Sequence, residues 1–328
     1  MTTPRFGFFF WPYEPALVAR MLGLGEAHGW DLVGVADTPG NAMDVWVALA
    51  QAATLSTRVR LASCVTNLAT RDPAITAGAA ASVDRLSGGR FVLGVGAGHS
   101  GVVNVGHRPA APAELRAGLD RVRALLGGDG GEARARVPVY AAASGPGALR
   151  AAGAAADGAF VNYGLGPVET SRARGLLAEG AEQADRGGAA LDTWFIACLD
   201  VSERRETALE QLGNILGFVA AYVLGPAPAE RGVPPELVPA VVELRRQYTT
   251  RRREMDPALV RRLGLFDYLR HRLAVAGTVE DCAEQTQAAL AAGASNLMFT
   301  VSLAADPIRT VELFGRHVLP RLRLPTGP

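Results

Sequence analysis

The side chain best suited to proton transfer stands in a glycine-rich run. His99 is one of five histidines and lies in Gly96-Ala97-Gly98-His99-Ser100-Gly101, directly after the apolar segment 91–95. Imidazole gains and loses a proton near neutral pH, so His99 is a candidate general acid or base. The alternative is an ordinary core or surface histidine without a catalytic role, which is the commoner case. The other four histidines lack the spacing of metal ligands, so we expect no metal site. They are His28, His107, His271 and His317.

The same run resembles two known motifs only superficially. It matches G-x-G-x-x-G, the dinucleotide-binding fingerprint, which also requires a helix at once and an acidic residue after a strand about 20 residues later. Here residues 106–112 are expected to form a loop, and the region about 20 residues on is expected to be helical. A hydrolase elbow, G-x-S-x-G, would need glycine where the chain has Val102. Neither a Rossmann domain nor a serine hydrolase is favoured.

A second candidate site is the segment Ser144-Gly145-Pro146-Gly147. Its small residues leave backbone N–H groups accessible, and a helix predicted to begin at about Pro146 directs its positive end at the loop. Ser144 adds a hydroxyl, and Gly164, on the loop after the next predicted strand, is expected to aid the same cofactor-binding site. The segment predicts a phosphate-binding turn; the alternative is an ordinary helix N-terminus.

Composition excludes several classes of enzyme. All 33 basic residues are arginine, so the lysine amine of Schiff-base enzymes, pyridoxal-phosphate enzymes and Walker-type NTPases is missing. The net charge of +1 provides no basic field for nucleic acid, and a small-molecule substrate is the expected partner. Nine arginines within 245–272 either form a solvated face or bind an anionic group. These are Arg245, Arg246, Arg251, Arg252, Arg253, Arg261, Arg262, Arg270 and Arg272.

Eight short apolar segments alternate with helical stretches and are expected to position these residues. Strands buried on both faces, each followed by a helix, are typical of a parallel sheet, and eight of them fit a closed (β/α)8 TIM barrel. Barrel enzymes carry their chemistry at the strand C-termini, where the polar and glycine residues gather. The predicted strands are 6–10, 31–36, 58–65, 91–95, 137–142, 158–162, 193–201 and 295–301.

We expect one barrel domain over residues 1–328. A Pro- and Arg-rich stretch at 226–273 is predicted to be a helical insertion between the seventh strand and the last barrel helix. No run of about 20 apolar residues predicts a membrane span. The N-terminus lacks the pattern of a signal peptide, and three widely spaced cysteines argue against disulfides, so a cytoplasmic location is expected.

Two segments resemble the luciferase-like monooxygenase superfamily, in particular its reductases that use the deazaflavin coenzyme F420. The first runs from Cys64 to Gly98 and contains Leu86-Ser87-Gly88-Gly89-Arg90 and Leu93-Gly94-Val95-Gly96-Ala97-Gly98. The second is the chain end, 314–323, which is similar to the last helix of that family. The resemblance covers nearly the whole chain and is weakest at about 226–273. It implies a (β/α)8 barrel with a flavin or deazaflavin at the strand C-termini, usually as a homodimer.

The resemblance also implies roles for particular residues. Cys64-Val65 matches a non-proline cis peptide behind the cofactor ring in the deazaflavin branch, and His99 occupies the position of an acid/base carboxylate. Asp37, with His99, is the second candidate catalytic residue. The remaining cofactor-binding positions are Thr66 and Asn67 beside the ring, Gly96, Ala97 and Gly98 near its side chain, and Ser144, Gly145 and Gly147 at the phosphate.

The resemblance predicts hydride transfer between coenzyme F420 and an organic substrate, with the protein supplying the pocket and the proton. One alternative is an FMN-dependent monooxygenase of the same fold, in which reduced flavin reacts with oxygen. Another is a non-catalytic flavin-binding protein, against which the presence of His99 and Asp37 argues.

Overall fold

The computed structural model describes residues 3–127, 137–186 and 191–323. Its strands form one parallel sheet in the order β10-β1-β2-β3-β5-β6-β7-β8, and β10 also pairs with β8, so the sheet closes. The fold is therefore the (β/α)8 TIM barrel that the alternation predicts. All eight predicted strands are confirmed: β1 (Phe6–Phe10), β2 (Leu32–Val35), β3 (Arg60–Ser63), β5 (Phe91–Gly96), β6 (Val139–Ala143), β7 (Gly158–Val161), β8 (Asp192–Val201) and β10 (Leu297–Thr300).

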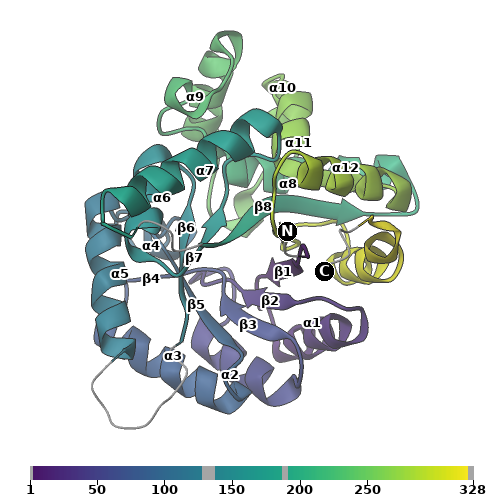
Figure 1. The fold of residues 1–328 in the computed structure, drawn as a ribbon. Coiled ribbons are helices and arrows are strands. Elements are labelled where there is room, and N and C mark those ends of the chain that lie inside the picture. Colours follow the sequence, from purple (N-terminus) through teal and green to yellow (C-terminus); the bar gives the residue numbers. More distant parts are fainter. Residues whose placement is uncertain (1–2, 128–136, 187–190, 324–328) are drawn as a thin grey trace. The chain divides into compact units, whose positions relative to one another are not determined.

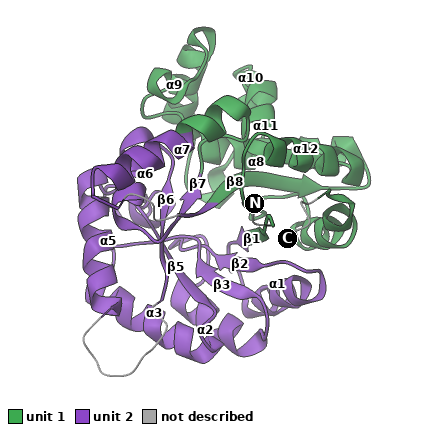
Figure 2. Cartoon of the chain, in the orientation of Figure 1, with its two compact units in different colours: residues 1–8, 162–172, 194–328 green, residues 9–161, 173–193 purple. Residues whose placement is uncertain are grey.

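The chain divides into two compact units (Figure 2). The larger in sequence comprises residues 9–161 and 173–193 and contains strands β2 to β7. Neighbouring strands are parallel and in direct register, for example Leu32 opposite Arg60 and Leu93 opposite Val139. Consecutive helices of this unit pack against one another around those strands (Figure 1). They are α1 (Pro15–Ala27), α2 (Val45–Leu55), α3 (Pro73–Ser87), α5 (Pro112–Leu126) and α6 (Pro146–Ala155).

The second unit comprises residues 1–8, 162–172 and 194–328. The ten-residue strand β8 pairs through its first part with β10, from Phe195 opposite Leu297, and through its last four residues with β9 (Ala274–Gly277). Its helices are α8 (Arg205–Val223), α9 (Val238–Gln247), α10 (Leu259–Arg262), α11 (Phe266–Leu273), α12 (Val279–Ala291) and α13 (Pro307–Leu313). Helix α7 (Pro167–Glu182) has residues in both units.

Several short elements differ from the prediction. Strand β9 was not predicted, since the insertion was expected to lead directly into a helix. Its sequence Ala-Val-Ala-Gly has little strand character of its own, and the strand forms by pairing with β8. Strand β4 (Thr66–Asn67) and helix α4 (Ser100–Val103) were expected to be loop. Helix α13 ends at Leu313, and the chain continues as a π-helical segment and then a 3₁₀ turn. The change is consistent with Pro320, which has no backbone N–H to donate.

The predicted insertion contains short helices in the structure. Within 226–273 these are α9, α10, α11 and three 3₁₀ turns. That this stretch is an insertion within a single domain stays a prediction. In the described ranges no helix is both long and apolar enough to cross a bilayer.

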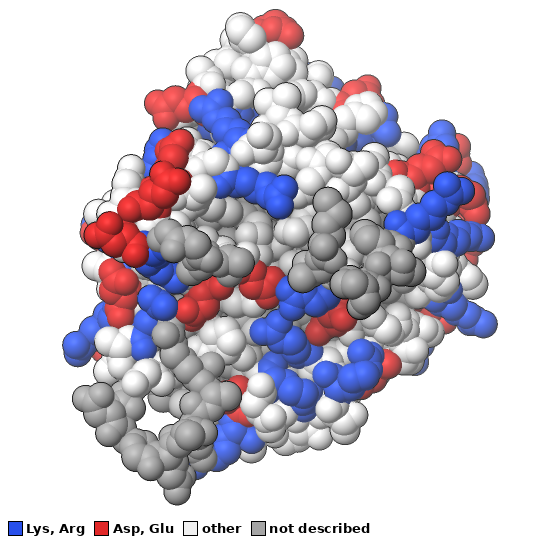
Figure 3. Space-filling model, in the orientation of Figure 1, with Lys and Arg blue, Asp and Glu red and all other residues white. Residues whose placement is uncertain are grey.

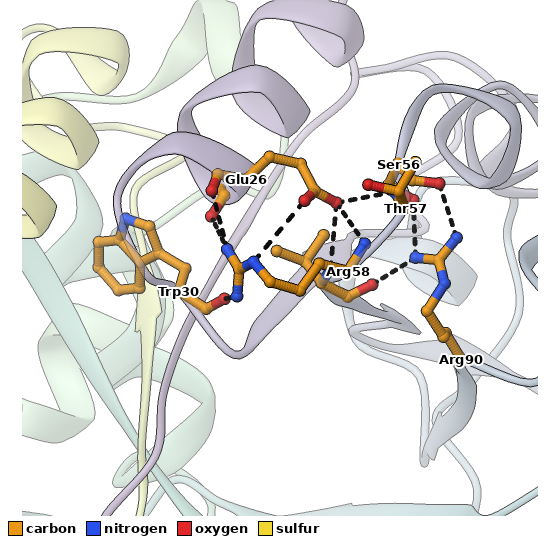
Figure 4. Close-up of polar contacts among 8 residues, drawn as sticks. Glu26, Trp30, Ser56, Thr57, Arg58 and Arg90 are labelled. Atoms are coloured by element: carbon orange, nitrogen blue, oxygen red, sulfur yellow. Dashed lines mark hydrogen bonds and ion pairs between the residues drawn. The ribbon is translucent and has the colours of Figure 1, made fainter.

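Charged side chains fix the start of β3 at the end opposite the candidate site. One oxygen of Glu26, near the end of α1, accepts hydrogen bonds from the backbone N–H groups of Thr57, Arg58 and Val59 at 2.9, 2.9 and 3.1 Å (Figure 4). The guanidinium of Arg58 donates to the carbonyls of Gly25 and Trp30. Burial alone would raise the pKa of Glu26, but the three N–H donors and the charge of Arg58 outweigh it and lower the pKa.

Candidate active site

Asp37 follows β2 and is a buried carboxyl group with one firmly held oxygen. Its residue is 7% exposed, and the hydroxyl of Thr66 donates to Oδ2 at 2.7 Å. Burial raises the pKa of Asp37, against the Thr66 hydrogen bond and the charge of Arg71, while the nearby Asp44 adds to the rise. Asp37 therefore keeps its proton to a higher pH than an ordinary aspartic acid.

The peptide bond between Cys64 and Val65 is cis, as the resemblance implies. Beyond it, β4 pairs with β5, so that Thr66 lies opposite Val95 and Asn67 opposite Gly96. Cys64 is buried, and burial raises the pKa of its thiol well above the ordinary value, so this thiol is not a nucleophile. Cys64 and Val65 separate β3 from β4, and we call this segment the Cys64–Val65 bulge. It presents Thr66 to Asp37 and turns the Val65 side chain against β5.

Glycines of β5 accommodate the neighbouring strand. A Cβ at Gly94 would lie 2.1 Å from the carbonyl oxygen of Ser63, and one at Gly96 would lie 2.8 Å from Cγ2 of Val65. Any larger residue would push the bulge away from the sheet. The predicted closeness of Gly96 to a cofactor is untested; within the chain, the glycine is explained by Val65.

His99 lies at the N-terminus of α4, in the same unit as Asp37. Its carbonyl accepts the N–H groups of Val102 and Val103 at 3.2 and 2.9 Å, so the first turn of α4 fixes its main chain. Gly98 precedes it with φ of 80°, a conformation that favours glycine, and a Cβ there would meet Val102 and Asn67. The His99 side chain is half-buried, and Ala97 is likewise half-buried.

The turn at Ser144 has the donor groups of an anion site. Gly145 is the N-cap of α6 and has no side chain to cap the helix, and Pro146 lacks an N–H. The N-cap residue therefore supplies no side-chain cap, and the positive end of a ten-residue helix lies at the turn. A Cβ at Gly147 would lie 2.7 Å from Cγ of Pro112, so close packing on α5 also requires glycine here.

Gly164 belongs to the second unit and is enclosed by charged side chains. Its φ is 134°, and a Cβ would lie 2.6 Å from Cγ of Glu169 and 3.2 Å from Cγ of Arg272. That Gly164 contributes to a phosphate site stays a prediction. The structure explains the residue by this packing.

The arginine-rich stretch does not act as one group. Four of its members form ion pairs with neighbouring acids, and blue and red side chains are interspersed over much of the face in Figure 3. The pairs are Arg246 with Glu243, Arg251 with Glu254, Arg262 with Asp256, and Arg270 with Asp267. A solvated face therefore explains these arginines better than an anion site.

Arg272 is the exception, and sequence reasoning did not separate it from its neighbours. Its side chain is buried and donates to the carbonyls of Tyr163, Arg231 and Gly232 and to the hydroxyl of Tyr268. Several carbonyls, together with Oε1 of Glu169 at 3.8 Å from Nη1, therefore satisfy the buried guanidinium. Arg272 thus orders the loop after β7.

The structure brings half of the predicted site residues of the unit 9–161 and 173–193 together in pairs. Asp37 meets Thr66, Val65 meets Gly96, and Asn67 meets Gly98. Sequence reasoning missed Thr38 and Ser100, whose buried hydroxyl groups lie 3.3 Å apart. Their position directly after Asp37 and His99 is the only signal that the sequence carries for them.

Comparison with known proteins identifies relatives of nearly the full length of the chain. The chain is 25% identical over 347 residues to the 5,10-methylenetetrahydromethanopterin reductase of Methanolobus tindarius, covering 96% of this chain and 99% of that protein. It is 27% identical over 343 residues to the F420-dependent glucose-6-phosphate dehydrogenase of Rhodococcus erythropolis, covering 95% of each.

A solved structure has the same fold. The coenzyme F420-dependent tetrahydromethanopterin reductase from Methanopyrus kandleri aligns with a TM-score of 0.78 and 22% identity, over 98% of this chain and 100% of that chain. The family model described as luciferase-like monooxygenase matches residues 13–296. The chain therefore belongs to the luciferase-like monooxygenase family.

Proposed function

We propose that the chain is an oxidoreductase that transfers hydride between coenzyme F420 and a small organic substrate. The observation that carries the proposal is Asp37, a buried carboxyl group with a raised pKa beside the Cys64–Val65 bulge. The relatives named for F420 align over nearly their whole length, which supports the choice of cofactor.

The residues of the site suit the parts of such a cofactor. Gly145, Gly147 and the Ser144 hydroxyl group offer the donors for a phosphate at the start of α6. The small residues Gly96, Ala97 and Gly98 leave room near the cofactor side chain, and the Cys64–Val65 bulge with Thr66 and Asn67 would support the ring. When bound, the deazaflavin supplies or accepts the hydride.

The protein moves the proton. Reduction of a carbonyl requires a proton at the carbonyl oxygen, and oxidation of an alcohol requires a base at its hydroxyl group. Burial raises the pKa of Asp37, so the carboxyl group keeps its proton to a higher pH than an ordinary aspartic acid, and Thr66 holds one oxygen so that the other remains available. His99 is the second group that can give or take this proton, consistent with its place directly after β5.

The alternative is an FMN-dependent monooxygenase, which the description of the matching family favours. Two measurements distinguish the cofactors. We expect the protein to bind F420 more tightly than FMN in fluorescence titrations. We also expect the absorbance of the cofactor to change with one of four substrates. Glucose 6-phosphate and propan-2-ol would be tested with oxidised F420, and methylenetetrahydromethanopterin and cyclohexanone with reduced F420. Tighter FMN binding, with oxygen consumption by reduced FMN, would contradict the proposal and establish the alternative.

We further propose a homodimer formed through α2 and α3. Val47 and Leu55 on α2 and Ile75 and Leu86 on α3 are each at least half exposed, and these two helices pack side by side. Exposed apolar side chains gathered on adjacent helices are typical of an interface. Val47→Glu with Ile75→Glu should give monomers in sedimentation velocity, whereas Val168→Glu on α7, equally exposed, should not. A parent that sediments as a monomer would disprove the dimer.

A cytoplasmic location is proposed as well. Cys64, Cys198 and Cys282 are all buried free thiols, which suits a reducing compartment. Fractionation of cells that express the native gene would test this.

A further inference from the structure

Helix α4 lies within a closed loop that follows β5. The N–H of Ala110 donates to the carbonyl of Ala97 at 2.7 Å, so residues 97–110 begin and end at the same place. Val102 is fully buried at its centre. Compact loops of this kind keep their shape through their own side chains. The orientation of His99 therefore depends on how this loop is attached to the strands.

Three contacts attach the loop to the segment after β2. The hydroxyl groups of Thr38 and Ser100 lie 3.3 Å apart, and both residues are buried. The amide of Asn104 donates to the carbonyl of Pro39 at 2.9 Å. A Cβ at Gly101 would lie 2.8 Å from the carbonyl oxygen of Asp37, so the two backbones touch. All three contacts join the strand end that carries Asp37 to the loop that carries His99.

The third strand end also takes part. Asn67 accepts the N–H groups of Ala69 and Thr70 through Oδ1, which orients its amide nitrogen 3.2 Å from the place of a Cβ at Gly101. Since Thr66 next to it holds Asp37, the loop, the carboxyl group and the bulge form one connected unit.

We infer that Thr38 and Ser100 form a latch that fixes the separation of Asp37 and His99 and keeps water from Asp37. They are positioning residues: neither is required to touch substrate. The inference rests on the proposed function only in treating Asp37 and His99 as the groups that move the proton. The latch itself is a property of the protein without cofactor.

The first test needs no activity. Hydrogen exchange of the amides of Val102 and Val103, measured by mass spectrometry on the full protein, reports whether α4 stays attached. Thr38→Val removes the hydroxyl group at nearly constant shape, and Ser100→Ala removes its partner. We expect exchange in residues 97–110 to become about tenfold faster in both, and to return to the parent rate in Thr38→Ser. Ser82→Ala, which removes an exposed hydroxyl group of α3, should change nothing.

The second test uses the pH profile of turnover, with the substrate that reacts best among the four compounds named above. Loosening α4 admits water to Asp37, so the limb of the kcat/KM profile that reports Asp37 should shift to lower pH, toward the ordinary range of aspartic acid. We expect kcat to fall about 10- to 100-fold in Thr38→Val while the F420 dissociation constant stays within about threefold. Thr38→Ser should recover most of kcat and the parent pH profile.

The outcomes separate the latch from the proposed function. Unchanged exchange in both Thr38→Val and Ser100→Ala would overturn the latch, as would a Thr38→Ser variant that behaves like Thr38→Val. If exchange is faster in Thr38→Val and Ser100→Ala but the parent protein turns over none of the four compounds, the result supports the latch and contradicts the proposed reaction. If Thr38→Val does not fold, Ser100→Ala alone decides.

Discussion

At the scale of the residue, the proposed reaction would divide the proton chemistry between the buried carboxyl group of Asp37 and the half-buried imidazole of His99. His99→Ala should lower kcat about 10²- to 10⁴-fold and leave F420 affinity nearly unchanged, because the predicted phosphate donors lie on α6. Asp37→Asn keeps the acceptor for Thr66 but cannot titrate, so it should remove the limb of the pH profile that reports the carboxyl group of Asp37. Steady-state kinetics from pH 4 to 9 measure both. If His99→Ala loses only cofactor affinity, His99 positions the ring and does not move the proton.

The residue scale also marks a limit of sequence reasoning. The resemblance led to Asp37, Thr66 and the cis bond at Cys64–Val65, and the structure brings the first two into hydrogen-bonding contact. The glycines were predicted to approach a cofactor, whereas Val65 and Pro112 occupy the space beside Gly96 and Gly147. Those partners come from distant parts of the chain, so spacing alone could not reveal them.

At the scale of the element, the start of α6 gives a prediction in which binding and stability change in opposite directions. Gly145 has extended backbone angles that any residue adopts, and aspartate is a favoured N-cap. Gly145→Asp should therefore maintain or raise the melting temperature while weakening F420 binding about 10- to 100-fold through repulsion of the phosphate. Gly145→Asn, of the same size without the charge, should bind much more tightly than Gly145→Asp. Equal affinities in the two variants would remove the phosphate from this turn.

Elements were predictable where burial on both faces dictates an apolar run. Strands such as β2 and β5 consist almost wholly of buried residues, and their sequences show it. Helix α4 and strand β9 have four residues each and form because of what they touch: α4 rests on the ends of neighbouring strands, and β9 on the last part of β8. Tertiary contact outweighs local preference in such short elements.

At the scale of the whole molecule, Asp200 should dominate the dependence of stability on pH. It lies near the end of β8, 1% exposed, accepts the N–H of Ala305 at 2.8 Å and faces Thr310, Asp306 and Cys282. Burial raises its pKa from 3.8 to about 7, against the hydrogen bonds from Ala305 and Thr310. Between these two values the folded protein holds a proton that the unfolded chain has released, so stability falls as pH rises through this window.

Asp200→Asn keeps an acceptor for Ala305 and removes the charge. The variant should match the parent near pH 4 and be more stable by up to about 4 kcal/mol at pH 8, measured by urea unfolding. Asp72→Asn, an exposed N-cap of α3 that asparagine also caps well, should show no such divergence with pH. Parallel stability curves for Asp200→Asn and the parent would mean that folding does not shift the pKa of Asp200.

The pairing of the first strand with the last has a consequence for synthesis on the ribosome. The backbone of Arg5 and the strand that follows it meet Asn296 and Leu297, which are translated almost at the end. At about 5–20 residues per second, the segment Phe6-Gly7-Phe8-Phe9-Phe10 waits roughly 15–60 s for that neighbour. During this interval an apolar, uncharged strand edge lies open to other nascent chains. Chaperone demand in the cell should therefore fall on the N-terminal five-residue strand, long before the barrel closes.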